Sequence, residues 1–193
     1  DKESSVEALK KAIKDLSAYS LPKTHGTNGY SSSTPTTDGK YVYAIFGNGI
    51  AACYDMDGNK KWMKFIEAPT HKWGHSSSPL LISNKLIVYI DNIFALDSET
   101  GKVLWKTDSK PRWGSPVRAK IGEVDVVVTP SGDIVRAEDG KILASEVSSL
   151  DYATPVVIGD KVYFIESGGK ALQLPKNVTE QIAPKVLWET TPK

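Results

Sequence analysis

The chain has 193 residues, of which 40 % are hydrophobic and 24 % are charged, a balance typical of a globular domain with a real core. Its 24 Lys and Arg nearly cancel its 23 Asp and Glu, so the net charge of +1 provides no bulk attraction to nucleic acid or to an anionic membrane. No apolar run reaches the roughly 18 residues that a transmembrane helix needs, so the sequence predicts no membrane span.

Cys53 is the single cysteine, so the chain cannot form an intramolecular disulfide or a cysteine-rich metal site. This count fits the cytosol, and it also fits an extracytoplasmic domain that needs no disulfide. The sequence opens on a charged stretch that does not resemble a signal peptide, which suits either a mature form or a fragment.

The first 22 residues are predicted to form an amphipathic helix and a linker. Ser4 and Glu7 have the spacing of a capping box, and Pro22 ends the helical pattern. One apolar stripe runs along residues 4–17, and it consists of Val6, Leu9, Ile13 and Leu16. We expect this helix to pack on a neighbouring domain or to cover a sheet edge; a helix that lies on a membrane surface or recruits a partner is the alternative.

Beyond about Tyr30 the sequence becomes a series of short β-rich runs separated by turn residues, and it contains an internal repeat. Four segments each consist of a small residue, a small hydroxyl residue and a proline. These segments are Ser33-Thr34-Pro35, Ser77-Ser78-Pro79, Gly114-Ser115-Pro116 and Ala153-Thr154-Pro155, and their prolines are 44, 37 and 39 residues apart.

The same succession of elements follows each proline. A turn leads to a β-rich run, a second turn leads to a third strand, and an Asp- or Gly-rich turn leads to a last strand. The β-rich runs are residues 41–46, 86–90, 124–128 and 162–165. The last strands carry Trp62, Trp105 and Trp188 at one equivalent position, where the third repeat has Ala144.

Four antiparallel strands joined by tight turns make one twisted sheet that has two faces to bury. Packing such sheets face to face around an axis buries both faces. The sequence therefore predicts an all-β protein, a β-propeller over residues 23–193 with blades at approximately 30–73, 74–113, 114–152 and 153–193. Small residues at the start of each repeat suit innermost strands, where the blades crowd together.

One repeat carries the signature of a known family. Residues 95–106, Ala-Leu-Asp-Ser-Glu-Thr-Gly-Lys-Val-Leu-Trp-Lys, resemble the A-L-D-x-x-T-G-K-x-x-W repeat of pyrroloquinoline-quinone (PQQ) repeat, quinoprotein-like β-propellers. Residues 55–62 are a shortened version, residues 139–143 keep only the turn, and the fourth repeat has an insertion at about 175–184. The resemblance implies a ring of seven or eight blades, with the others supplied by a longer parent chain or by self-association. A self-contained ring of four blades is the remaining alternative.

The resemblance leaves the function open, because the family contains quinone-dependent dehydrogenases, an outer-membrane-protein assembly lipoprotein, and secreted or sensor propellers. A dehydrogenase would imply bound PQQ, Ca²⁺, an aspartate base and often a disulfide of adjacent cysteines. Cys53 cannot make that disulfide, and no residue matches the base or the Ca²⁺ ligands. We therefore predict a non-catalytic binding or protein-interaction scaffold of bacterial type, without cofactor, in the periplasm or outside the cell. The alternatives are a fragment of a PQQ- and calcium-dependent dehydrogenase and an extracytoplasmic sensor domain.

The stretches that lead into the innermost strands are the candidate ligand-binding rim, because loops of several blades converge at the mouth of a propeller. A protein or a small polar ligand would bind there. Alternatively, the tryptophans pack between blades and the histidines are solvated loop residues. A metal site at two histidines four residues apart has no carboxylate or cysteine nearby in the sequence to support it. The candidate residues are His25, Tyr30, His71, Trp73, His75, Arg112, Trp113 and Tyr152.

Cys53 aligns with Ala95 on a third strand, so it is predicted to be a small buried core residue and not a nucleophile. Two glycine-rich segments, Gly47-Asn48-Gly49 and Gly168-Gly169, are predicted hairpin turns, because no helix follows them to bind a phosphate.

Overall fold

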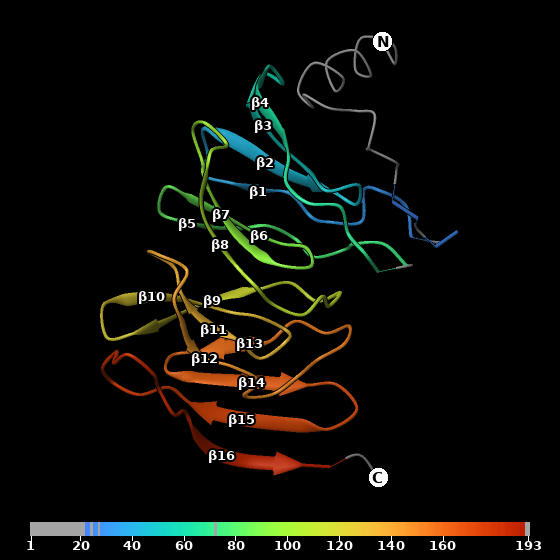
Figure 1. Cartoon of the computed structure of the whole chain (residues 1–193). Coiled ribbons are helices and arrows are strands. Elements are labelled where there is room, and N and C mark those ends of the chain that lie inside the picture. Colours follow the sequence, from blue (N-terminus) through green and yellow to red (C-terminus); the bar gives the residue numbers. More distant parts are fainter. Residues whose placement is uncertain (1–21, 24, 27, 72, 192–193) are drawn as a thin grey trace.

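The computed structural model describes residues 22–23, 25–26, 28–71 and 73–191, and these form four separate antiparallel sheets of four strands each (Figure 1). Within every sheet the strands are paired in chain order, so each sheet is one up-and-down blade. The described residues thus have the all-β fold that the repeat predicts. The helix predicted over residues 4–17 lies outside the described residues.

Each blade takes four consecutive strands, and we number the blades 1 to 4 in chain order. Blade 1 consists of β1 (Thr36–Thr37), β2 (Tyr41–Phe46), β3 (Ile50–Asp55) and β4 (Lys60–Phe65). Blade 2 consists of β5 (Leu80–Ile82), β6 (Lys85–Tyr89), β7 (Ile93–Asp97) and β8 (Val103–Thr107). Blade 3 consists of β9 (Val117–Ile121), β10 (Val124–Val128), β11 (Ile134–Arg136) and β12 (Ile142–Ala144). Blade 4 consists of β13 (Val156–Ile158), β14 (Lys161–Ile165), β15 (Gly169–Gln173) and β16 (Lys185–Thr190).

The blades follow one another along the molecule, with blade 1 and blade 4 at opposite ends (Figure 1). The first strands of successive blades lie close together, β1 beside β5, β5 beside β9, and β9 beside β13. These strands are therefore the innermost ones, as in a propeller. Three apolar clusters fill the space between blades 1 and 2, blades 2 and 3, and blades 3 and 4.

The same irregularity recurs between the third and fourth strands of all four blades. Cys53 pairs with Trp62, Ala95 with Trp105, and Ala171 with Trp188, and the register shifts directly after each pair. In blade 3 the shift follows the pair of Ile134 with Ala144. The predicted equivalence of the three tryptophans and Ala144 is thus confirmed by the strand register. Cys53 is buried, as predicted.

Each docked tryptophan crosses into the next blade. The Trp62 Nε1–H donates to the Ser98 carbonyl at 2.9 Å, and the Trp105 Nε1–H donates to the Ala137 carbonyl at 3.1 Å. Both acceptors belong to the turn before the last strand of the next blade. The glycine of that turn lies against the indole: a Cβ on Gly101 would come within 2.8 Å of the Trp62 ring. This close approach explains why the repeat motif requires a glycine.

Blade 3 has no tryptophan to dock, and the insertion in blade 4 takes its place. Val178 and Ile182, both in the 11-residue connection between β15 and β16, pack on the cluster between blades 3 and 4. The Ile182 N–H also donates to the Leu143 carbonyl at 2.8 Å, one residue before Ala144. The insertion therefore closes the space that the smaller Ala144 side chain leaves open.

A ladder of hydrogen bonds joins the innermost strands where the small–hydroxyl–proline segments lie. The Thr34 N–H donates to the Ser78 hydroxyl, the Ser78 N–H to the Ser115 hydroxyl, and the Ser115 N–H to the Thr154 hydroxyl, each at 2.9 Å. The second, third and fourth repeats thus each supply a hydroxyl acceptor to the repeat before them. This ladder holds the preceding loops of the blades at one end of the molecule.

Candidate binding site

Aromatic rings from three successive blades stack at the end where these loops meet. The Trp113 and Tyr152 rings are 5.0 Å apart and nearly parallel, at 15°. The Trp73 and Trp113 rings are 5.5 Å apart with an interplanar angle of 33°. The His71 imidazole meets Trp113 edge-on, with the ring centroids 4.2 Å apart. The rings therefore form one continuous aromatic surface that extends across several blades.

This surface lines a hollow of about 470 Å³. The Trp73 side chain is 42 % exposed and Tyr152 is also exposed, so the rings are accessible to a partner. The hollow is mostly apolar, with few polar groups, and its lining consists of His25, Asn28, Trp73, Ser76, Trp113 and Tyr152. A surface of this kind suits the burial of an apolar or aromatic group whose orientation a few hydrogen bonds fix.

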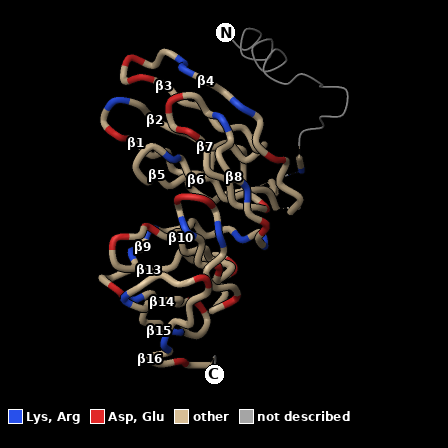
Figure 2. The backbone as a smooth tube through the Cα atoms, turned by 60° about the vertical axis from the view of Figure 1, so that its left-hand side comes forward, with Lys and Arg blue, Asp and Glu red and all other residues tan. Residues whose placement is uncertain are grey.

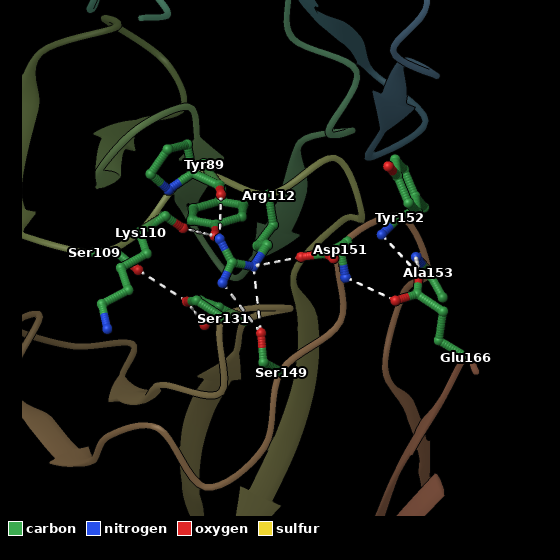
Figure 3. A network of polar contacts seen from close by, with 12 residues as sticks. Tyr89, Ser109, Lys110, Arg112, Ser131, Ser149, Asp151, Tyr152, Ala153 and Glu166 are labelled. Atoms are coloured by element: carbon green, nitrogen blue, oxygen red, sulfur yellow. Dashed lines mark hydrogen bonds and ion pairs between the residues drawn. The ribbon is translucent and has the colours of Figure 1, made fainter. Parts of the chain in front are cut away.

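Glu166 holds the segment that carries Tyr152. Its carboxylate accepts three backbone N–H groups, from Asp151 at 2.9 Å, Tyr152 at 2.8 Å and Ala153 at 3.0 Å (Figure 3). Partial burial acts to raise the pKa of Glu166, but the three donors outweigh it and the net pKa shift is downward. Glu166 is therefore ionised at neutral pH, and it clamps the Tyr152 backbone.

Arg112 links the loop that leads into blade 3 to the loop that leads into blade 4 through polar contacts. Its guanidinium lies 3.4 Å from the Asp151 carboxylate and donates to the Ser149 hydroxyl at 3.2 and 3.3 Å (Figure 3). The backbone of Trp113 donates to the Asp151 carbonyl at 3.0 Å. These contacts fix the separation of Trp113 and Tyr152, the two rings that stack most closely.

Two polar side chains that line the hollow donate hydrogen bonds to the backbone carbonyls of Trp73 and Trp113. The Asn28 side-chain amide donates to the Trp73 carbonyl at 2.7 Å, and the Ser76 hydroxyl donates to the Trp113 carbonyl at 3.0 Å. These two polar groups thus serve mainly to position the aromatic rings.

His75 does not belong to the exposed rim that the sequence predicts, because its side chain is only 4 % exposed. Its Nε2 lies 2.7 Å from the Tyr89 carbonyl, which can only accept, so Nε2 carries the proton. The buried Nδ1 has no hydrogen-bond partner. Burial lowers the pKa of His75, which keeps the ring neutral at neutral pH.

A polar cluster next to the loop before Arg112 could not be predicted from the sequence. The Ser109 hydroxyl donates to the Asp133 carboxylate at 2.6 Å, and the Ser131 hydroxyl donates to the same oxygen at 2.9 Å. The Tyr89 hydroxyl donates to the Lys110 carbonyl (Figure 3). Ser109 joins blade 2 to the Asp133 hairpin of blade 3, so the cluster anchors the loop. Nothing in the sequence marks these residues as neighbours.

The structure brings together four of the eight predicted rim residues in the hollow itself, namely His25, Trp73, Trp113 and Tyr152. His71 packs edge-on against the rings, and Arg112 lies behind them. Tyr30 lies apart, and its hydroxyl donates to the Pro22 carbonyl at 2.9 Å. Among the described residues, the structure shows no group of three His, Cys, Asp or Glu side chains arranged to hold a metal ion.

Comparisons with solved structures show the same fold. BamB from Moraxella catarrhalis has a TM-score of 0.52 at 19 % identity, over 74 % of this chain and 44 % of that chain. The computationally designed Ika8 protein has a TM-score of 0.58 at 12 % identity, over 82 % and 48 %. The quinohemoprotein alcohol dehydrogenase from Comamonas testosteroni has a TM-score of 0.56 at 15 % identity, over 89 % and 36 %. The chain thus spans less than half the length of these three proteins.

A search among curated proteins found no match. A family model described as outer membrane protein assembly factor BamB matches residues 14–107 and, in an overlapping second match, residues 90–178. The two matches together extend over most of the chain, and they include the tryptophan-docking turns and the strands that carry them. The chain therefore belongs to the BamB-like family of PQQ-repeat β-propellers.

Proposed function

We propose that this protein is a non-catalytic scaffold, and that it binds a segment of a partner protein on the aromatic surface formed by Trp73, Trp113 and Tyr152. The observation that carries the proposal is the stack of these rings across three blades, beside a hollow of about 470 Å³. Aromatic side chains offer a large contact area at low entropic cost and are enriched at binding hot spots. The family description, an assembly factor, favours a protein as the partner.

The charge distribution favours a protein partner over nucleic acid. Lys and Arg alternate with Asp and Glu along the described chain, and neither sign dominates one side (Figure 2). Nucleic-acid binding depends on a basic stripe that displaces counterions from phosphates. The apolar lining of the hollow suits instead an extended peptide that packs an aromatic or proline side chain against the exposed rings.

The family description also supports a location outside the cytoplasm, since it refers to assembly of outer membrane proteins. We propose a periplasmic or extracellular location on this ground. Within the described part of the chain, no helix is long and apolar enough to cross a bilayer.

Similarity to the quinohemoprotein alcohol dehydrogenase supports a second candidate function, a fragment of a PQQ- and Ca²⁺-dependent dehydrogenase. The lining of the hollow does not fit the calcium site that this activity needs, because none of its six residues has a carboxylate. The rings offer a planar quinone only a surface on which to stack.

Peptide selection tests the proposed function directly. A random-peptide display library selected on the immobilised chain supplies the probes, and titration calorimetry measures the affinity of the recovered peptides. We expect micromolar binding that Trp73→Ala weakens by about tenfold or more, the loss typical of an aromatic anchor. Addition of PQQ with Ca²⁺, followed by quinone absorbance, tests the second candidate.

Trp188→Ala is the matched control, because Trp188 is 42 % exposed like Trp73 but lies on β16, away from the hollow. The control should bind the selected peptides as the unaltered chain does. Equal affinity of the unaltered chain and the Trp73→Ala variant would contradict the proposed site. Stoichiometric binding of PQQ and Ca²⁺ would favour the dehydrogenase instead.

A further inference from the structure

The back of blade 4 exposes side chains whose equivalents in blade 2 are buried. Ile158 corresponds to Ile82 in the strand register, and it is 64 % exposed where Ile82 is 2 % exposed. Ile165 corresponds to Tyr89, and it is 56 % exposed where Tyr89 is 1 % exposed. In blade 2 this face packs on blade 3. The back of blade 4 is therefore built as an interblade face.

Two hydrogen-bond donors on this face also lack the partners that their equivalents in the earlier blades have within the described chain. The Trp62 and Trp105 indoles donate to the next blade, whereas the Trp188 Nε1–H has no hydrogen-bond partner among the described residues. The N–H groups of the three earlier ladder residues donate to the next hydroxyl, whereas the Thr154 N–H has no such acceptor in the described chain. A blade that covers this face must therefore supply a hydroxyl at the ladder and a turn for the indole.

Blade 1 presents both of these features on the side where a preceding blade would lie. Thr34 holds the ladder position, and no donor in the described part of the chain reaches its hydroxyl. Gly58 corresponds to Gly101, since each donates its N–H to the carbonyl of the aspartate that opens its turn. Its φ of +83° is likewise positive, and a Cβ on Gly58 would meet nothing within 4 Å. The place that Trp62 fills on Gly101 is thus open on Gly58.

We infer that the back of blade 4 binds blade 1 of a second copy of this chain, so that two copies close one eight-bladed ring. Trp188 of each copy docks on the Gly58 turn of the other, and the Thr154 N–H donates to the Thr34 hydroxyl of the other. Two arcs of four blades give eight blades, which lies within the usual range of a closed propeller. This interface continues the three that the chain already contains, and it is independent of the aromatic hollow.

Sedimentation analysis over a range of micromolar concentrations tests this inference. We expect a species with twice the 21.0 kDa chain mass, in equilibrium with the single chain. Trp188→Ala should weaken the association by about thirtyfold or more, as expected for an aromatic anchor at the centre of an interface. Circular dichroism and thermal unfolding serve to check that each variant is folded. The control variant Trp113→Ala, in the hollow, should leave the association unchanged.

Two glycine variants distinguish the effect of blocked docking on association from the effect of backbone strain. Gly58→Leu places a side chain where the Trp188 indole of the other copy would lie, and it should abolish the association. Gly39→Leu is the matched control, because Gly39 has a φ of +86° and open space around it but lies in the turn between β1 and β2. A single-chain mass at all concentrations, or equal association of the Gly58→Leu variant and the unaltered chain, would overturn the inference.

Discussion

At the scale of single residues, the turn glycines decide how closely one blade can approach the next. Gly101 and Gly140 have positive φ angles, and each lies against the indole of the preceding blade. The Thr-Gly-Lys motif of the sequence therefore encodes a contact between blades as well as a turn. The sequence predicts the turn, but the contact depends on a tryptophan 39 residues away and becomes visible only in the fold.

Substitution of Gly101 by alanine measures this contact. The new Cβ would lie 2.8 Å from the Trp62 ring, so the variant carries a steric cost in addition to its backbone strain. Gly159→Ala carries comparable strain, with a φ of +62° against +68°, but meets nothing within 4 Å. We expect Gly101→Ala to lower the free energy of unfolding by about 1–3 kcal/mol more than Gly159→Ala, as measured by urea denaturation. An equal decrease in the free energy of unfolding of both variants would show that the Trp62 indole can shift at no cost.

His75 shows why a buried residue was among those predicted for the rim. Two histidines four residues apart in an irregular loop have no periodicity that separates an exposed ring from a buried one. Structure places His71 on the aromatic surface and His75 against the Tyr89 carbonyl. The distinction depends on the loop path, which contacts between blades determine.

The buried imidazole predicts a pH dependence of stability. Burial lowers the pKa of His75 in the folded chain, whereas in the unfolded chain it stays near 6.5, so the unfolded state binds the proton more readily. The stabilising contribution is complete above pH 6.5 and is lost as the pH falls from there toward the folded pKa. Urea denaturation from pH 7.5 to 5 should show this loss, and His75→Gln should flatten the profile. An unchanged slope in the variant would assign the effect to other groups.

At the scale of elements, the insertion in blade 4 and the missing tryptophan of blade 3 are one structural feature. In the sequence they are two separate irregularities of the repeat. Val178 and Ile182 of the insertion pack beside the strand of Ala144, so each irregularity compensates for the other. The relation could not be predicted because the two segments are about 35 residues apart and no rule of local structure connects them.

A double-mutant cycle tests this compensation. Deletion of residues 177–183 leaves six residues between the paired Leu172 and Val186. The same number separates the equivalent pairs in blades 2 and 3, Leu96 with Val103 and Val135 with Ile142. The deletion alone should destabilise the chain by about 2 kcal/mol or more, since it removes apolar side chains from the cluster. Ala144→Trp alone should cost about 1–3 kcal/mol through overpacking. Together they should cost at least about 1 kcal/mol less than the sum, as measured by urea denaturation; additive losses would contradict the compensation.

At the scale of the whole molecule, the repeat was enough to predict the sheets and their order. The period, the turns and the tryptophan positions all indicate one propeller, and the register of every blade agrees with them. The sequence also predicts which loops lie together at one end of the molecule. It could not show that Trp73, Trp113 and Tyr152 stack while the Tyr30 hydroxyl donates to the Pro22 carbonyl, because ring orientation depends on packing between loops of different blades.

A stack of blades in which each contacts only its neighbours should not be equally stable throughout. The middle strands of blade 2, β6 and β7, are buried from both sides, whereas every residue of β16 is exposed. Hydrogen exchange followed by mass spectrometry, at concentrations where the chain is a single copy, should therefore show the slowest amides in β6 and β7. The fastest strand should be β16, because opening it exposes little additional apolar surface. Uniform protection across the four blades would show instead that the arc unfolds as one cooperative unit, with the interblade contacts stronger than the blades themselves.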